Sequence, residues 1–468
     1  MSVENTHMGA EAIGCMLDGL DSVFFIGIGG INMSSLAHLT YKSGYRVGGS
    51  DRTETELTRK LEACGISVHY GHSAENAKEY DAFVYTVAIS PDNPEYVYAK
   101  QAGKPCISRA DYLGYIMTKY QRRIGISGMH GKSTCTSMCA QVLIDAGTDP
   151  TVLSGAELCA MGGAYCVGNS SDFVFEACEY MDSFLDFNPT VAVILNIEMD
   201  HVDYFKSMDQ IRASFAEYAA RTGKDGYAVY NSDDTDVLAA LDGYEGTRIS
   251  FAVEDKTAMI RAENIKKGAC GYSFDIIRSG ETFCHVDLNV SGYHNIYNAL
   301  ASAAACMLCG LSGSDIARGL ERFCGARRRM EYKGAVNGAY VYDDYGHHPT
   351  EISATLSGAK DMTSGRLFCV YQPHTYSRTA ALFEDFVLSF DACDRVITVD
   401  IYAAREKNTF GVSSLGLAKR IGAKASFAPD FKAAADVLAT ELRAGDVAVV
   451  MGAGDIYKVF EFLPFSEE

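Results

Sequence analysis

The sequence predicts an α/β protein of three domains, in which mostly parallel sheets carry ligand loops at the ends of their strands. At 468 residues the chain is long enough for about three domains. Two glycine-rich turns, at residues 27–33 and 128–134, each follow an apolar segment that is typical of a buried strand. Strands and helical segments alternate through most of the chain, and this alternation is typical of parallel sheets. We expect a Rossmann-like N-terminal domain, a central P-loop ATPase-like domain with antiparallel hairpins, and a Rossmann-like C-terminal domain.

Composition excludes several classes of function. The formal net charge of −19 argues against nonspecific binding to nucleic acid or to an anionic membrane. The first twenty residues lack the basic and apolar regions of a signal peptide, and no apolar run reaches membrane-spanning length. The fifteen cysteines are odd in number and lack paired zinc spacing. We therefore expect a reduced, cytoplasmic protein, with small-molecule substrates, that is a monomer or weak homodimer.

The first domain, expected over residues 1–120, begins with an apolar strand that enters a glycine turn. A helix follows the turn, and a second strand ends at Asp51, about 20 residues beyond the glycines. This is close to a dinucleotide fingerprint, except that Asn32 replaces its third glycine. The turn suits a nucleotide diphosphate lying on the helix start, with Asp51 near a ribose. We expect Gly29 to need a positive φ or a close approach to the ligand. The candidate ligand contacts are Gly27, Gly29, Gly30, Ile31, Asn32, Met33 and Asp51.

The second domain, expected over residues 121–329, begins with a phosphate-binding loop. A strand runs into a glycine turn that ends in Gly-Lys-Ser and opens a helix. The motif is the shorter G-x-x-G-K-S, because Ile126 replaces the first glycine of the usual P-loop. Converging backbone N–H groups and the helix dipole predict ATP binding. The candidate residues are Gly128, Met129, His130, Gly131, Lys132, Ser133 and Thr134.

Acidic residues at strand ends in the same domain predict a metal site. Glu176 ends one apolar strand, and His201 lies in an acidic segment after another. With the Ser133 hydroxyl, these residues could hold the Mg²⁺ that accompanies ATP. Further along, residues 258–290 alternate in polarity and predict antiparallel hairpins. Arg327 belongs to an arginine run that we interpret as phosphate-binding.

The third domain, expected over residues 330–468, has four predicted strands alternating with helices. The strands are expected over residues 340–345, 366–371, 395–401 and 446–451, and each ends in polar or glycine-rich residues. This pattern predicts another parallel sheet with a ligand edge. The candidate residues after these strands are Asp344, Tyr345, His347, His374 and Arg378.

Taken in order, these motifs resemble the Mur ligase family. The resemblance extends across all three domains and includes His294-Asn295 with Asn298, residues 196–201, and Gly452-Ala453-Gly454. Its departures are Met129 and Ser133 in the loop, Cys178 where an aspartate is common, and Thr375 where an arginine is frequent. Ser133 keeps the hydroxyl. At Thr375 the family's contact would fall to Arg378 or Arg405.

The resemblance implies an ATP-dependent ligase that joins L-alanine to the carboxylate of UDP-N-acetylmuramate through an acyl phosphate, in cytoplasmic peptidoglycan precursor synthesis. A family member that reattaches a recycled murein peptide is the alternative, and an NAD-dependent dehydrogenase or a noncatalytic nucleotide-binding protein is less favoured. The implied domain roles are UDP-substrate binding, ATP binding and ligation, in that order. Mg²⁺ is the implied metal, with one ion on Ser133 and Glu176 and a second on His201, and Mn²⁺ is expected to substitute. The implied catalytic residues are Lys132, Glu176, His201, His347 and Arg378, with Asn295, Asn298, Asp344 and Tyr345 near adenosine.

Overall fold

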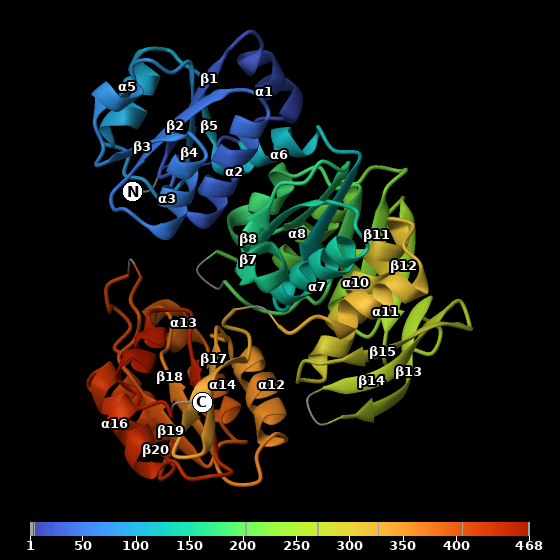
Figure 1. Ribbon diagram of the computed structural model, residues 1–468, viewed down its shortest axis with the longest axis vertical. Helices are drawn as coiled ribbons and strands as arrows, with labels where there is room; N and C mark the ends of the chain where they lie inside the picture. The colour runs from blue at the N-terminus through green and yellow to red at the C-terminus, as the bar shows by residue number, and fades with distance from the viewer. Residues whose placement is uncertain are drawn as a thin grey trace.

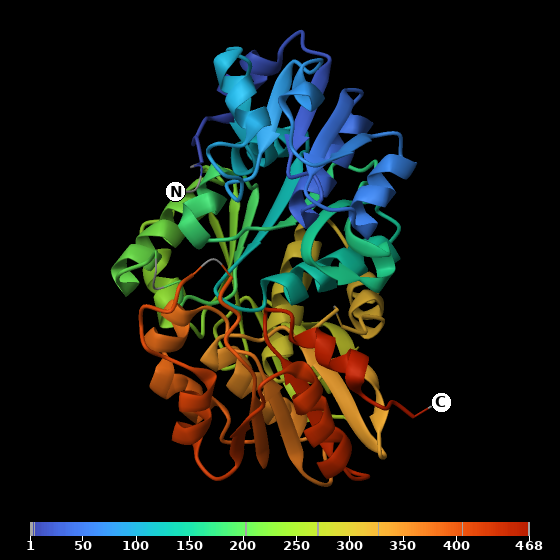
Figure 2. The ribbon, with the colours of Figure 1, turned by 90° about the vertical axis from the view of Figure 1, so that its left-hand side faces the viewer.

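The computed structural model describes residue 3 and residues 5–201, 204–268, 271–325, 327–404 and 406–466. Three sheets lie one after another along the molecule (Figure 1). The turned view shows the N-terminal sheet above the central one and the C-terminal sheet below it (Figure 2). The expected fold class is therefore confirmed. Within the described ranges, none of the helices is both long and apolar enough to cross a membrane.

The N-terminal sheet is fully parallel and has strand order β3-β2-β1-β4-β5. Because β1 lies between β2 and β4, the turn after β1 opens at the point where the strand order reverses. The strands are β1 (Ser22–Ile26), β2 (Arg46–Asp51), β3 (Ser67–Tyr70), β4 (Ala82–Tyr85) and β5 (Cys106–Ser108). The helices are α1 (Ala10–Leu17), α2 (Ile31–Lys42), α3 (Glu56–Ala63), α4 (Ala74–Ala77), α5 (Pro94–Gln101) and α6 (Arg109–Met117).

The central sheet has ten strands in the order β15-β14-β13-β12-β11-β10-β6-β9-β7-β8. Its middle is parallel, and β13 to β15 form the antiparallel hairpins that the sequence predicts. The antiparallel β7–β8 pair was not predicted. The strands are β6 (Arg122–Ser127), β7 (Thr151–Leu158), β8 (Gly163–Cys166), β9 (Asp172–Glu176), β10 (Val191–Ile194), β11 (Tyr227–Asn231), β12 (Thr247–Ala252), β13 (Ile260–Lys267), β14 (Tyr272–Arg278) and β15 (Glu281–Leu288). The helices are α7 (Lys132–Asp145), α8 (Met208–Ala220), α9 (Thr235–Ala240), α10 (His294–Leu308) and α11 (Gly313–Glu321), with short 3₁₀ segments η1 (Cys159–Met161) and η2 (Tyr180–Asp186).

The C-terminal sheet has strand order β16-β17-β21-β18-β19-β20, and β16 alone of these strands runs antiparallel to its neighbour. The four predicted strands are present, and the edge strands β16 and β20 are additional. The strands are β16 (Glu331–Val336), β17 (Ala339–Asp344), β18 (Leu367–Tyr371), β19 (Arg395–Thr398), β20 (Ala425–Phe427) and β21 (Val447–Met451). The helices are α12 (Pro349–Lys360), α13 (Tyr376–Ala381), α14 (Phe383–Ser389), α15 (Ser414–Ile421) and α16 (Phe431–Glu441), with the 3₁₀ segment η3 (Ile456–Phe462).

The two joints between the sheets differ in chemistry. One apolar core runs from the N-terminal sheet into the central one, through Leu113 of α6 and Phe184 of η2. The apolar clusters around the C-terminal sheet contain only residues of the C-terminal part of the chain. Its described contacts to the central part include polar pairs such as Thr350 to Glu198 and Arg378 to Asp200. We infer that the C-terminal part is the one more easily displaced, since a shared apolar core resists separation.

Candidate functional site

The phosphate loop joins β6 to α7 in the middle of the central sheet, as the sequence predicts. Gly128 and Gly131 have φ of +138° and +83°, which favour glycine. A Cβ on Gly131 would also lie 2.6 Å from Asn298 Oδ1. No side chain caps the start of α7, so its first amide groups stay open to an anion. Ser133, in the first turn, is buried.

Glu179 holds Lys132 and His201 together beside this loop. Lys132 Nζ lies 2.9 Å from Glu179 Oε2, and His201 Nε2 lies 3.1 Å from Glu179 Oε1. Burial alone would lower the pKa of Lys132, but the Glu179 charge raises it above its ordinary value. Lys132 also donates to the carbonyl oxygens of Gly128 and Met129. The structure thus brings a cation, a carboxylate and an imidazole to one point.

Glu176, the expected metal ligand, faces a different group. Its carboxylate accepts hydrogen bonds from Ser154 Oγ, at 3.3 Å, and from the backbone N–H of Gly155. A Cβ on Gly155 would lie 2.6 Å from Glu176 Oε2, so the β7 backbone approaches this carboxylate closely. Glu179 lies three residues beyond Glu176 and is not among the expected ligands. The structure places Glu179, rather than Glu176, against both Lys132 and His201.

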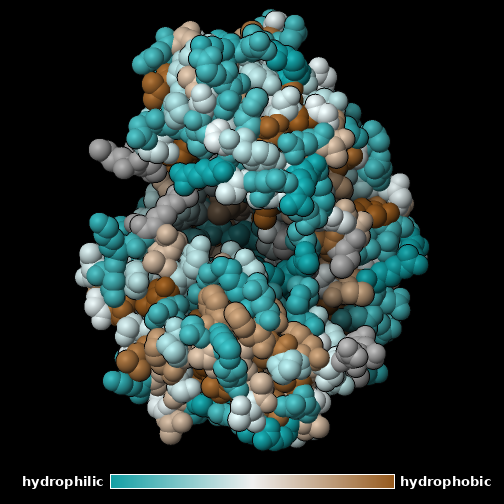
Figure 3. All heavy atoms as spheres, turned by 60° about the vertical axis from the view of Figure 1, so that its left-hand side comes forward, coloured by the Kyte–Doolittle hydropathy of each residue, from teal (hydrophilic) through white to brown (hydrophobic). Residues whose placement is uncertain are grey.

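A cavity of about 720 Å³ lies between the central and C-terminal parts. Figure 3 shows that this face of the molecule is deeply hollowed between the N-terminal part above and the C-terminal part below. The side-chain amides of Asn295 and Asn298, both on α10, are hydrogen-bonded to each other, with Asn298 Nδ2 donating to Asn295 Oδ1 at 2.9 Å. The expected nucleotide-binding residues that line the cavity are His130, Gly131, Thr134, Asn295, Asn298 and Asp344.

Six expected nucleotide contacts lie outside this cavity lining: Gly128, Met129, Lys132 and Ser133 of the phosphate loop, and Arg327 and Tyr345. Arg327 is mostly exposed and pairs with Glu157 at the end of β7. The Tyr345 ring packs against the guanidinium of Arg329, 5.4 Å from the ring centre. Arg329 itself lines the cavity and lies 3.8 Å from a carboxylate oxygen of Glu351. From the arginine run, the structure therefore brings Arg329 rather than Arg327 to the cavity.

Three expected residues of the C-terminal part gather beside His201. The His347 and His374 rings lie 5.8 Å apart, and Arg378 Nη1 is 3.3 Å from His374 Nδ1. Arg378 Nε in turn is 3.2 Å from Oδ1 of Asp200, the residue before His201. Burial lowers the pKa of His347 to about 3 and that of His374 to about 4. Both imidazoles are therefore neutral at pH 7, and His374 Nδ1 accepts a hydrogen bond from Arg378.

The N-terminal glycine turn is closed by Asp51. Gly27 has φ of +85°, and Asp51 Oδ2 accepts the N–H of Gly29 at 2.8 Å. Gly29 lacks a positive φ, so that part of the expectation is wrong. A Cβ there would lie 2.8 Å from Asp51 Oδ2, and this approach is what requires glycine. Ile31 and Asn32 are exposed, whereas the Met33 side chain is buried in the core.

Arg109 is a residue that the sequence did not single out. It begins α6 at the end of β5, and it lies within electrostatic reach of Cys178 and Asp186. Burial lowers the pKa of its guanidinium. Among the residues that the structure describes, it forms no ion pair or hydrogen bond. Arg109 is half-buried, and a guanidinium partly removed from water without a partner is unfavourable, so an anionic ligand would satisfy it. Arg405, an expected alternative to Arg378, lies outside the described residues.

Three family models match consecutive parts of the chain. The first is "Mur ligase family, catalytic domain", which matches residues 22–121. The "Mur ligase middle domain" matches residues 126–306, and "Mur ligase, glutamate ligase domain" matches residues 328–454. Each match covers one of the three sheets for most of its length.

Curated relatives match over nearly the whole chain. The UDP-N-acetylmuramate–L-alanine ligase of Acetivibrio thermocellus is 45% identical over 94% of this chain and 94% of its own length. That of Clostridium novyi is 44% identical over 95% of this chain and 97% of its own. A crystal structure of the UDP-N-acetylmuramate–alanine ligase from Thermotoga maritima is similar, with TM-score 0.78, 28% identity, and coverage of 94% and 98%. A murein peptide ligase from Psychrobacter arcticus shares the fold, at TM-score 0.70 and 24% identity over 95% of this chain and 98% of its own.

Proposed function

This chain belongs to the Mur ligase family, and from that premise we propose that it joins L-alanine to the carboxylate of UDP-N-acetylmuramate. Members of this family are ATP-dependent ligases. The observation that supports the proposal most is the 41–45% identity to relatives named for this reaction, over nearly the whole chain. The alternative, a ligase for a recycled murein peptide, has weaker support from the fold-level likeness to such an enzyme.

The chemistry requires activation of a carboxylate that does not react with amines by itself. The substrate carboxylate attacks the γ-phosphorus of ATP, which gives an acyl phosphate and ADP. The amine of L-alanine then attacks the acyl carbon, loses a proton, and expels phosphate as the amide forms. Because most reactants are anions, the protein must neutralise charge and align groups.

The central part supplies the phosphate contacts in this proposal. The open amides at the start of α7 and the Lys132 ammonium would bind the ATP phosphates. Lys132 would exchange its contacts to its own loop carbonyls for phosphate oxygens. The cavity beside Asn295 and Asn298 would take the adenosine, with Asp344 from the C-terminal part. The expected contacts of Arg327 and Tyr345 stay predictions, and Arg329 has the better position.

The donor set beside the loop fits a magnesium ion. Ser133 offers a hydroxyl, Glu179 and Glu176 offer carboxylates, and His201 offers a ring nitrogen. Mg²⁺ prefers hard oxygen ligands shared with phosphates. We place the ion on Ser133, Glu179 and His201. Glu176, which the sequence suggested as the carboxylate ligand, is the alternative to Glu179. When bound, the ion would neutralise charge between the phosphates and the substrate carboxylate. Substitution by Mn²⁺ stays a prediction, based on the imidazole ligand.

The other parts would hold the remaining substrate groups. The turn over residues 27–33, with Asp51, would bind the diphosphate and ribose of the UDP moiety, and Arg109 another anionic group of this substrate. His347, His374 and Arg378 would face the muramoyl carboxylate and the incoming amine. Residues 1–120, 121–329 and 330–468 then keep the proposed roles of UDP-substrate binding, ATP binding and ligation.

Phosphate release tests the proposal. Purified protein would be incubated with ATP, Mg²⁺ and UDP-N-acetylmuramate, and each amino acid and a murein tripeptide would be compared as the acceptor. We expect release with L-alanine, dependent on the UDP substrate. Release with the tripeptide and not with L-alanine would favour the murein peptide ligase. Release independent of the UDP substrate would contradict both. The cytoplasmic location and the oligomeric state stay predictions.

A further inference from the structure

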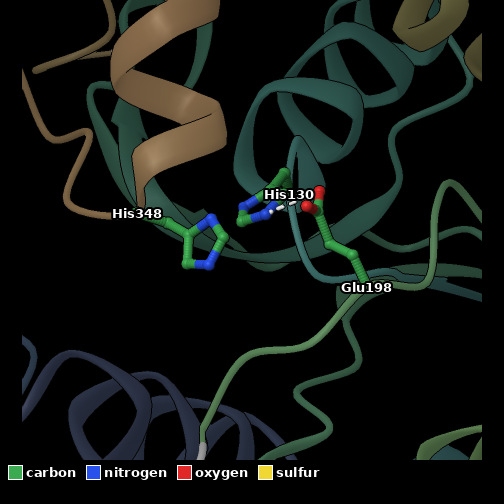
Figure 4. Close-up of side chains that lie close together, drawn as sticks. All are labelled: His130, Glu198 and His348. Atoms are coloured by element: carbon green, nitrogen blue, oxygen red, sulfur yellow. Dashed lines mark ion pairs between the residues drawn. The ribbon is translucent and has the colours of Figure 1, made fainter. Parts of the chain in front are cut away.

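We propose that His130, Glu198 and His348 form a binding site for a divalent transition metal ion of the Zn²⁺ type, between the central and C-terminal parts. One donor atom from each side chain lies within 4.8 Å of the other two. His130 belongs to the phosphate loop, Glu198 follows β10, and His348 precedes α12 (Figure 4). The site does not include Lys132, Glu179 or His201, but His130 and Glu198 also line the cavity that we propose for the nucleotide.

The contacts within the group are already short. His130 Nε2 is 2.9 Å from Glu198 Oε1, and the two imidazole centres are 4.7 Å apart with the rings inclined by 32°. Adjacent ligands of a tetrahedral Zn²⁺ ion lie about 3.3 Å apart, given metal–nitrogen bonds of about 2.0–2.1 Å. A small inward rotation of the side chains would therefore reach this geometry.

Each of the two histidines has a buried ring nitrogen without a hydrogen-bond partner among the described residues. His348 is only 5% exposed, and its Nε2 has no hydrogen-bond partner in the part of the chain that the structure describes. His130 Nε2 is buried as well, and its contact with Glu198 lacks the angles of a hydrogen bond. A buried polar atom without a partner is unfavourable. Because His348 Nδ1 accepts the backbone N–H of Thr350 at 3.4 Å, Nε2 carries the proton of the neutral ring, and a metal ion at Nε2 would displace that proton and replace this long contact.

Neighbouring groups orient the proposed ligands as they do around metals. His130 Nδ1 lies 3.3 Å from Glu351 Oε1, and Nε2 lies 2.9 Å from Glu198 Oε1, so without an ion the two carboxylates favour a proton on each ring nitrogen. A metal ion at Nε2 would take the place of that proton, while Glu351 would keep the proton on Nδ1. Thr350 Oγ1 donates to Glu198 Oε2 at 2.8 Å, which leaves Oε1 directed at His130. A carboxylate behind a ligating histidine is usual in metal sites.

The donor types decide which ion fits. Two imidazoles and one carboxylate suit Zn²⁺, Co²⁺ or Ni²⁺, whereas Mg²⁺ prefers an oxygen-rich set. Three protein ligands leave a fourth position for water or another small ligand. Because His348 comes from the C-terminal part and the others from the central part, a bound ion would also hold these two parts together.

Cobalt absorption tests the site on the full-length protein. Protein freed of metal with a chelator would be titrated with CoCl₂, without nucleotide, and the visible d–d absorption recorded. We expect a saturable band of tetrahedral intensity at one ion per chain, and a higher melting temperature with Zn²⁺. His348→Ala and the isosteric Glu198→Gln should each weaken Co²⁺ binding at least tenfold.

His201→Ala is the matched control, because it removes an imidazole from the other group and should leave the band in place. Circular dichroism would verify that each variant is folded. If His348→Ala does not fold, Glu198→Gln carries the test. The proposal is overturned if both variants bind Co²⁺ like the unmodified protein, if no tetrahedral band forms, or if the band disappears only in His201→Ala.

Discussion

Lys132 Nζ lies 2.9 Å from Glu179 Oε2, and this contact joins the phosphate loop to the segment after β9. Glu179 is buried and the Lys132 side chain is only 16% exposed, so water screens these two opposite charges weakly. Removal of one partner leaves the other charge uncompensated. The pair therefore combines a structural contact with groups that we propose for phosphate and metal binding.

Lys132→Ala should lower turnover by roughly 10²–10³, because a preorganised phosphate contact is lost. His201 still lies against Glu179 and should keep that carboxylate partly compensated. Lys224→Ala is the control, since that side chain is 80% exposed. Steady-state phosphate release and circular dichroism check the result. Near-normal turnover in a folded Lys132→Ala protein would remove the loop lysine from the mechanism.

Glu179→Gln should raise the Mg²⁺ concentration needed for half-maximal activity by at least tenfold, since one charged oxygen ligand is lost. Glu176→Gln should have a smaller effect, because Glu176 is already bound by the β7 backbone. A metal titration of phosphate release in both variants distinguishes the two carboxylates. A larger shift for Glu176→Gln would restore the ligand that the sequence suggested.

The limits of sequence reasoning are visible in this pair. The phosphate loop could be predicted because strand, glycine turn and helix are adjacent in the chain. Glu176 ends β9, and Glu179 lies three residues beyond it, just before the turn at Met181 and Asp182, where φ is +54°. The path of the chain out of β9 and into this turn decides which carboxylate reaches Lys132. No local periodicity encodes such a turn. The contact of His130 with His348 joins segments far apart in the chain, so local sequence patterns could not predict it either.

Gly29→Val should weaken binding of UDP-N-acetylmuramate at least tenfold and leave ATP binding unchanged. The new Cβ would lie 2.8 Å from Asp51 Oδ2 and would displace this carboxylate, which closes the turn by accepting the N–H of Gly29. Gly163→Val is the control, because a Cβ at that strand glycine meets nothing within 4 Å. Calorimetric titration with each nucleotide measures both affinities. Loss of ATP affinity with normal UDP-substrate affinity would reverse the proposed roles of the two parts.

His38 should make stability depend on pH. Its ring lies 3.3 Å from the Tyr165 hydroxyl, at the joint between the N-terminal and central parts, and burial lowers its pKa. The unfolded chain, with a histidine pKa of about 6.5, then binds more protons than the folded chain below that pH. Stability should fall as pH drops from about 6.5 toward the lower folded-state pKa. His38→Gln should reduce the difference between urea midpoints at about pH 7.5 and about pH 5.5, and an unchanged difference would assign the effect to other groups.

Arg109→Met should weaken binding of UDP-N-acetylmuramate and yet leave the protein as stable as before, or more stable. The guanidinium forms no ion pair or hydrogen bond within the described residues, so its removal breaks no contact and ends a desolvation cost. Arg122→Met is the control, because Arg122 pairs with the buried Asp172 and its loss should destabilise the protein. Melting temperatures and UDP-substrate affinities would be measured for both variants.

Arg109→Lys separates charge from shape at the same position. It keeps the positive charge but loses the planar fork that binds two oxygens of one anion. We expect an intermediate affinity for UDP-N-acetylmuramate and an unchanged affinity for ATP, because the anion at Arg109 belongs to the UDP substrate in our proposal. Equal affinity in all three proteins, together with a lower melting temperature for Arg109→Met, would make Arg109 a structural residue of the α6 joint.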